Sequence, residues 1–191
     1  MSTDGMKFIL GSASPRRKML LTGLGIAFRV EVKEIDETCP GNVPADQLAA
    51  CIAQRKSDQF FPSHIRPDEI LITADTIVVQ GGHVIGKPRD RKEAIAMISR
   101  LSGRMHRVYT GVCIRSLQKQ VLFTEMSKVW FIPLTPQAIA EYVDQYNPYD
   151  KAGAYGIQEW IGYAGIARVE GSFFNVMGLP THRVYQELLV F

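Results

Sequence analysis

The sequence GSASPRR at residues 11–17 joins a short apolar run to the start of a helical pattern. The apolar run at residues 8–10 is predicted to form a strand. Ser14 followed by Pro15 is typical of a helix N-terminus, because a serine hydroxyl caps free backbone N–H groups and proline suits the first helical position. We therefore predict a strand, a loop and a helix that begins at Pro15, which is the opening unit of an α/β fold.

The first turn of this helix is unusually basic. Arg16, Arg17 and Lys18 occupy positions where the helix dipole disfavours each cation by about 0.3–1 kcal/mol. A bound anion would offset that cost, because free N–H groups, serine hydroxyls and guanidinium groups together match a phosphate group. The alternative is a capped surface helix whose arginines are solvated.

The composition is that of an ordinary globular chain. The 191 residues are 46% hydrophobic and 21% charged, with a net charge of +3. This length favours a single domain over residues 1–191. The slight positive charge suits an anionic ligand but is too small to indicate a nucleic-acid partner. No apolar run approaches the length of about 18 residues that a membrane span needs, and no signal-peptide core is present, so we expect no membrane partner.

The three cysteines are Cys39, Cys51 and Cys113. They are widely spaced, odd in number and without a Cys-x-x-Cys pair or nearby histidines at metal-ligand spacing. We expect them to be reduced and the protein to be cytoplasmic.

Outward from the first helix, strand-like and helix-like patterns alternate along the chain. The predicted strands are residues 27–32, 70–79, 108–114, 120–132, 166–169 and 172–177, with a hairpin at 81–88. The predicted helices are residues 15–24, 44–60, 90–103, 135–146 and 180–189. Alternation interrupted by hairpins predicts an α/β protein with a mixed sheet and flanking helices.

Two charged residues interrupt apolar patterns. Asp75 lies within the apolar strand 70–79, where an unpaired carboxylate would cost several kcal/mol, so it must be paired, protonated or bound to a cation. A functional role, as metal ligand or general base, and a structural ion pair both satisfy this condition. Lys56 lies on the apolar stripe of the helix 44–60, so it either extends to solvent or points into a ligand cleft.

Three further positions are candidates for phosphate or base contacts. GGHVIGKP at 81–88 matches a P-loop except at Pro88, where a serine or threonine would hold magnesium, and its glycines lie in a predicted hairpin. We exclude the P-loop and retain Lys87 as a phosphate contact. The acidic residues at 34–37 precede a turn and are either solvated or face a cleft. Gln158, in the glycine-rich loop 150–158, is either a reader of a base edge or a surface amide.

These residues together resemble the Maf family, in family order over nearly the whole chain. The motifs are GSASPRR at 11–17, IDE at 35–37, Lys56, TADT at 73–76, GKPR at 86–89, LSG at 101–103, DKAGAYGIQ at 150–158 and GLP at 178–180. Members of that family split the bond between the α and β phosphates of nucleoside triphosphates with a divalent cation. The resemblance also implies two lobes around a central cleft, as in inosine triphosphatase-like proteins, and suggests a homodimer.

The resemblance assigns a set of site residues. They are Ser12, Arg16, Arg17, Glu37, Lys56, Asp75 and Lys87. Asp75 would accept a proton from the attacking water or bind the metal, and Glu37 would be the second metal ligand, with Asp36 as the alternative carboxylate. Mg²⁺ is the expected cation, with Mn²⁺ as an alternative, because the site offers oxygen ligands.

Arg16, Thr76 and Gln158 resemble the branch of the family that prefers dTTP and UTP, rather than the branch that acts on 7-methyl-GTP. A glutamine amide offers both a donor and an acceptor to a pyrimidine edge. The competing hypothesis is a non-catalytic nucleotide-binding regulator of septum formation. A carboxylate within a basic pocket favours the enzyme, because a simple phosphate binder gains nothing from it unless a metal bridges the two.

Overall fold

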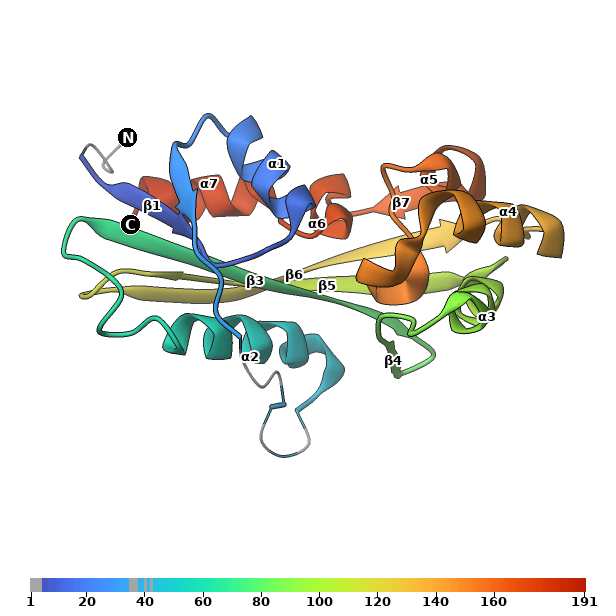
Figure 1. Cartoon of the computed structure of the whole chain (residues 1–191), viewed down its shortest axis with the longest axis horizontal. Coiled ribbons are helices and arrows are strands. Elements are labelled where there is room, and N and C mark those ends of the chain that lie inside the picture. The colour runs from blue at the N-terminus through green and yellow to red at the C-terminus, as the bar shows by residue number, and fades with distance from the viewer. Residues whose placement is uncertain (1–4, 35–37, 40, 42) are drawn as a thin grey trace. The chain divides into compact units, whose positions relative to one another are not determined.

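The computed structural model describes residues 5–34, 38–39, 41 and 43–191 (Figure 1). These residues form a seven-stranded sheet in the order β2-β1-β3-β5-β6-β7, with β4 paired to β3. β1 is parallel to β2 and β3, whereas β4 is antiparallel to β3 and β7 is antiparallel to β6. The strands are β1 Lys7–Leu10, β2 Phe28–Val30, β3 Glu69–Gln80, β4 His83–Ile85, β5 Met105–Arg115, β6 Gln120–Phe131 and β7 Ile166–Glu170. The predicted mixed sheet is confirmed.

Seven α-helices accompany the sheet in the part of the chain that the structure describes. They are α1 Pro15–Gly23, α2 Ala45–Asp58, α3 Arg91–Leu101, α4 Pro136–Tyr146, α5 Trp160–Gly165, α6 Phe173–Met177 and α7 Thr181–Leu189, with short 3-10 turns at Pro148–Asp150 and Ala152–Ala154. The predicted α/β class with flanking helices is therefore confirmed. β4 pairs with β3 through Val79 and Val84, so the glycines at 81–82 form a hairpin turn and not a P-loop.

The chain divides into two compact units. Unit 1 contains residues 1–75, 110–125 and 178–191, and unit 2 contains residues 76–109 and 126–177. Strands β3, β5 and β6 contribute residues to both units. The single domain over residues 1–191 and the central cleft implied by the resemblance stay predictions.

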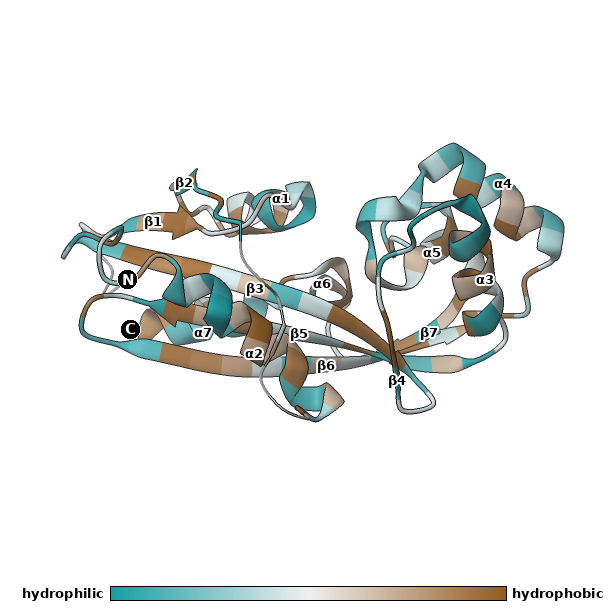
Figure 2. Cartoon of the chain, turned by 60° about the horizontal axis from the view of Figure 1, so that its bottom comes forward, coloured by the Kyte–Doolittle hydropathy of each residue, from teal (hydrophilic) through white to brown (hydrophobic). Residues whose placement is uncertain are grey.

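Unit 1 packs its strands tightly against α2, which carries Lys56. Figure 1 shows α1 on one side of these strands and α2 on the other, and Figure 2 shows that α2 has both hydrophobic and hydrophilic segments. Ala49, Ile52 and Ala53 are buried on its inner face. A Cβ on Gly111 of β5 would lie 2.2 Å from the backbone of Ala49, so only glycine permits this approach. The close packing fixes the position of α2 on the sheet.

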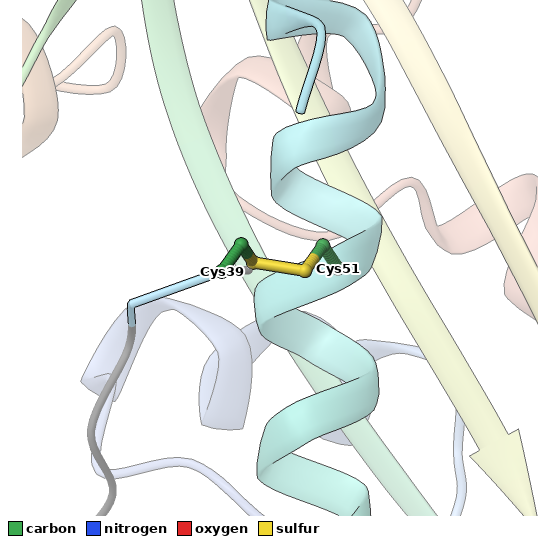
Figure 3. The surroundings of a disulfide bond; sticks show 2 residues. All are labelled: Cys39 and Cys51. Atoms are coloured by element: carbon green, nitrogen blue, oxygen red, sulfur yellow. A yellow bond between two sulfur atoms is a disulfide. The ribbon is translucent and has the colours of Figure 1, made fainter. Parts of the chain in front are cut away.

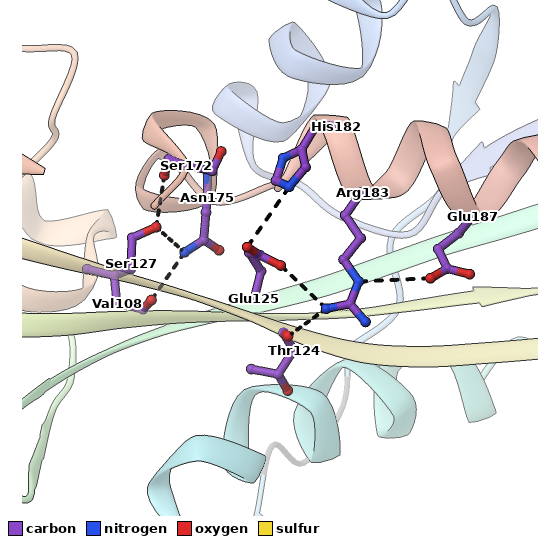
Figure 4. Close-up of polar contacts among 9 residues, drawn as sticks. All are labelled: Val108, Thr124, Glu125, Ser127, Ser172, Asn175, His182, Arg183 and Glu187. Atoms are coloured by element: carbon purple, nitrogen blue, oxygen red, sulfur yellow. Dashed lines mark hydrogen bonds and ion pairs between the residues drawn. The ribbon is translucent and has the colours of Figure 1, made fainter. Parts of the chain in front are cut away.

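Polar contacts fix the last two helices, each within its own unit (Figure 4). In unit 1, Arg183 of α7 donates to the Thr124 carbonyl oxygen of β6 at 3.2 Å. In unit 2, the Asn175 amide of α6 donates to the carbonyl oxygen of Val108 at 3.2 Å and to Ser127 Oγ at 2.9 Å. Asn175 is fully buried, so these contacts anchor α6 to β5 and β6.

Some sequence-based predictions were wrong. Residues 172–177 were expected to be a strand, but residues 173–177 form helix α6, because the Ser172 hydroxyl accepts the N–H of Asn175 at 3.2 Å and caps the first turn. Within α1, Leu20 and Leu21 are buried, whereas Met19 is 53% exposed. Helix α5 was not predicted.

The expectation of reduced cysteines was also wrong for one pair. Cys39 and Cys51 are joined by a disulfide bond that links the segment before α2 to α2 itself (Figure 3). Cys113 is free and buried. Spacing alone did not reveal the pair, because the two cysteines are 12 positions apart and no motif marks them. Over the described residues, none of the helices combines the length and apolar character needed to cross a membrane.

Candidate active site

The N-terminus of α1 orients Arg17 in unit 1. The Ser14 side chain accepts the N–H of Arg17 at 3.4 Å, as the predicted cap requires. The guanidinium of Arg17 donates from Nε to the Gly178 carbonyl oxygen at 2.9 Å and from Nη1 to Ser12 Oγ at 3.2 Å. Ser12 is buried and Arg16, on the same turn, is half-buried. Serine hydroxyls and two arginines thus meet at one helix N-terminus, which is suitable chemistry for an anion.

Gly11, which precedes this loop, is required by close packing. A Cβ at this position would lie 2.7 Å from the Thr73 methyl group and 3.2 Å from a Leu71 methyl group, both on β3. The Gly11 N–H donates to the carbonyl oxygen of Ile72 at 2.9 Å. The loop that carries Ser12 is therefore held directly against the strand that carries Asp75.

Lys56 and Asp75 form an ion pair within unit 1. The distance from Lys56 Nζ to Asp75 Oδ1 is 2.7 Å, and the two side chains are only 18% and 15% exposed. The Thr73 hydroxyl donates to the carbonyl oxygen of Ala53 at 2.7 Å, which ties β3 to α2 one turn before Lys56. Removing either partner would leave a largely buried charge without its counterion. Both explanations offered for Asp75, a site carboxylate and an ion-pair partner, agree with this geometry.

The remaining candidates that the structure describes lie in unit 2. Thr76 is half-buried in β3, and Lys87 is exposed just after β4. Gln158 is half-buried before α5, and its Oε1 atom is buried with no hydrogen-bond partner among the described residues. A buried amide oxygen without a donor is unusual in folded proteins.

Asp36 and Glu37 lie outside the described residues. No cluster of three or more histidine, cysteine, aspartate or glutamate side chains that could hold a metal ion occurs in the described part of the chain. Among the described residues Asp75 is the metal ligand that the sequence predicts, and a carboxylate oxygen is a ligand type that Mg²⁺ accepts.

The sequence pattern missed the side chains that support Gln158. Tyr142 of α4 is 2% exposed, and its hydroxyl contacts Gly156 and Glu159 on either side of Gln158. Lys151 also pairs with Glu159, at 3.2 Å. Helical periodicity predicts that such a tyrosine is buried, and it does not identify the partner of its hydroxyl.

Comparison with known proteins finds relatives that match this chain over nearly its whole length. The family model described as "Maf-like protein" matches residues 7–191. A dTTP/UTP pyrophosphatase from Parabacteroides distasonis is 50% identical over 183 residues, which cover 95% of this chain and 94% of the relative. Another from Porphyromonas gingivalis is 48% identical over 95% of this chain and 92% of the relative.

A more distant likeness occurs among solved structures. The structure of a HAM1 protein from Coxiella burnetii covers 66% of this chain and 73% of its own, with a TM-score of 0.43 at 15% identity, which is too weak to support a conclusion. The match to the family model and the identity to the two relatives both extend over nearly the whole length. This chain therefore belongs to the family of Maf-like proteins.

Proposed function

We propose that this chain is a nucleoside triphosphate pyrophosphatase. It hydrolyses dTTP and UTP to the corresponding nucleoside monophosphate and inorganic diphosphate. The observation that carries the proposal is the largely buried Lys56–Asp75 pair, in the same unit as the Ser12–Arg17 helix N-terminus. A carboxylate fixed by a lysine suits the activation of water, and the helix N-terminus suits phosphate. The full-length relatives named dTTP/UTP pyrophosphatase support the same activity.

Arg17, Arg16 and Ser12 would bind the phosphate chain. The guanidinium of Arg17 is already oriented by the Gly178 carbonyl oxygen and by Ser12 Oγ, so little side-chain freedom is lost when phosphate binds. Lys87 would contribute a third positive charge, which its exposed position leaves accessible.

Asp75 would orient and deprotonate the water that attacks the α-phosphate. The water oxygen forms a bond to phosphorus, the bond to the bridging oxygen breaks, and diphosphate leaves while Asp75 takes the proton. Lys56, at 2.7 Å from Asp75, fixes the orientation of the carboxylate. A bound Mg²⁺, or Mn²⁺, would neutralise charge on the phosphates, with Asp75 and Glu37 as the protein ligands available to it.

Gln158 would select the base. Uracil and thymine present an N3–H donor between two carbonyl oxygens, whereas cytosine has an acceptor at N3. The amide of Gln158 offers an acceptor for that N3–H and a donor for a neighbouring carbonyl oxygen. Arg16 and Thr76 would share in this choice, as the resemblance implies.

The competing function is a non-catalytic nucleotide-binding regulator of septum formation. Measurement of diphosphate release from a panel of normal and modified nucleoside triphosphates, with Mg²⁺, with Mn²⁺ and without either, separates the two. We expect release from dTTP and UTP only when a divalent cation is present. Nucleotide binding without release from any triphosphate would overturn the proposal in favour of the regulator.

A homodimer is the arrangement that the resemblance suggests, and a cytoplasmic location is the one that the sequence features favour. Light scattering of the purified chain would test the dimer. A disulfide is unusual in a reducing compartment, so the oxidation state of Cys39 and Cys51 in cells bears on the location.

A further inference from the structure

The loop that carries Gln158 is held to unit 2 before it reaches that residue. The N–H of Gly153 donates to the carbonyl oxygen of Gly86 at 2.9 Å. Gly153 has a φ of +73°, and a Cβ there would lie 3.2 Å from a methyl group of Val78 on β3. The loop therefore starts from a fixed backbone position.

Tyr142 contacts the loop on both sides of Gln158. Its hydroxyl accepts the N–H of Gly156 at 3.0 Å and donates to Glu159 Oε2. Burial, reinforced by the neighbouring Glu159 carboxylate, raises the pKa of Tyr142, so the hydroxyl keeps its proton and remains a donor. One side chain of α4 thus fixes the residue two positions before Gln158 and the residue immediately after it.

Glu159 is held in turn from its other oxygen. Lys151 Nζ lies 3.2 Å from Glu159 Oε1 and 2.7 Å from Asp150 Oδ1, and the Lys151 side chain is only 10% exposed. The Glu159 carboxylate therefore has a hydrogen-bond donor on one oxygen and a cation on the other. Such a fully partnered carboxylate is a rigid support.

Gly156 brings this support close to the amide of Gln158. A Cβ on Gly156 would lie 2.7 Å from the carboxyl carbon of Glu159 and 2.9 Å from Gln158 Nε2. Any larger residue would push both side chains away. The Gly156 backbone, which Tyr142 holds by its N–H, is therefore the surface on which the amide of Gln158 rests.

Tyr155 is a second anchor of the loop, and it acts through uncharged groups. Its hydroxyl lies 2.7 Å from His106 Nε2, and its ring meets His106 and Phe131 edge-to-face at 5.4 and 5.0 Å. Burial lowers the pKa of His106 to about 4 and raises that of Tyr155, so both groups are neutral at pH 7. The backbone three residues before Gln158 is thus fixed independently of Tyr142.

We propose that Tyr142 is a positioning residue for base selection: its hydroxyl fixes the segment 156–159 so that the amide of Gln158 meets the base in a single orientation. The inference rests on the proposed function, since it assumes that Gln158 reads the base. A tyrosine that only filled the core would make the fold more stable and would not alter the choice between bases.

The test compares the specificity constant, kcat/KM, for UTP and CTP in Tyr142→Phe, which keeps the ring and removes the hydroxyl. We expect the UTP/CTP ratio of kcat/KM to fall about tenfold, the worth of one hydrogen bond, mainly through a higher KM for UTP. Tyr146→Phe is the matched control, because Tyr146 stacks on Tyr142 in the same helix with the ring centres 5.0 Å apart. The UTP/CTP ratio of kcat/KM should not change in this control variant.

A double-mutant cycle with Gln158→Ala tests the route of the effect. Once the amide is removed, Tyr142→Phe should reduce the UTP/CTP ratio no further. Glu159→Gln keeps an acceptor for the Tyr142 hydroxyl and weakens the contact with Lys151. We expect it to lower the UTP/CTP ratio by a smaller factor than Tyr142→Phe does. It also provides the test if Tyr142→Phe does not fold.

The possible failures are distinguishable. If the wild-type chain releases no diphosphate from any triphosphate, the proposed function is overturned. If the wild type prefers UTP and the folded variants lose activity on UTP and CTP by the same factor, Tyr142 is purely structural and this inference is overturned.

Discussion

Unit 1 and unit 2 hold their candidate residues in different chemical environments. In unit 1, Lys56 and Asp75 are charged and pair with each other, and Arg17 is oriented by fixed oxygen atoms. In unit 2, Gln158 is supported by the hydroxyl of Tyr142 and by the neutral cluster around Tyr155. Charges act on the phosphates that all nucleotides share, whereas neutral hydrogen-bonding groups can distinguish bases. Changes at Lys56, Asp75 and Arg17 should therefore affect all nucleotides alike, and changes at Gln158 and its supports should affect them selectively.

The largest effect is expected at the Lys56–Asp75 pair. Asp75→Asn keeps the shape of the side chain and an oxygen for Lys56, and it removes the proton acceptor. We expect kcat to fall about 10²–10⁴-fold for dTTP, UTP and CTP alike, with nucleotide affinity measured by calorimetry nearly unchanged. Asp68→Asn, which changes an exposed carboxylate paired with Lys7, is the control. Turnover retained in Asp75→Asn would exclude Asp75 as the base.

The neutrality of the aromatic cluster in unit 2 predicts a pH effect on stability. The folded pKa of His106, about 4, lies below its ordinary value of 6.5. As the pH falls from 6.5 to 4 the unfolded chain therefore binds a proton that the folded chain does not, and the free energy of unfolding should decrease by about 3 kcal/mol. His106→Gln should remove this contribution in urea unfolding at pH 7, 5.5 and 4.5.

His83→Gln, at an exposed position of the β4 hairpin, provides the control for that measurement and should leave the pH dependence unchanged. If the pH dependence of stability is the same in His106→Gln as in the wild type, His106 is not held uncharged in the folded chain, and the cluster around Tyr155 is not a neutral anchor.

A smaller effect is expected when the charge of Arg17 is kept and its shape is changed. Lysine in Arg17→Lys cannot donate to the Gly178 carbonyl oxygen and to Ser12 Oγ from one planar group. We expect kcat/KM to fall about 10–100-fold by the same factor for UTP, dTTP and CTP. Lys18→Ala, in the exposed part of the same turn, should have little effect. A loss that depended on the base would contradict the division of roles between the units.

Local signals in the sequence predicted most of the fold. Ser14 and Pro15 predicted the start of α1 because capping depends on adjacent residues, and Asp75 was conspicuous because a carboxylate rarely interrupts an apolar strand. Residues 173–177 were misassigned to a strand because their aromatic and β-branched composition is typical of strands, and the cap by Ser172 outweighed that preference.

Contacts between distant positions could not be predicted in this way. The partner of Lys56 lies 19 residues away, on another element, and the hydroxyl of Tyr142 finds its partners in a loop that its own helix does not specify. The Cys39–Cys51 bond likewise depends on the path of the chain before α2. The roles of the site residues stay predictions until the variants are measured.

The division of the chain has a consequence for how such a protein can change over generations. The chain passes from one unit to the other after Asp75, Tyr109, Glu125 and Met177, so neither unit is a continuous stretch of the gene. A single recombination event cannot transplant unit 2 into a relative. Gln158 and its supports Tyr142, Lys151 and Glu159 all lie within the continuous stretch 126–177, so they can change together while the rest of the chain is kept.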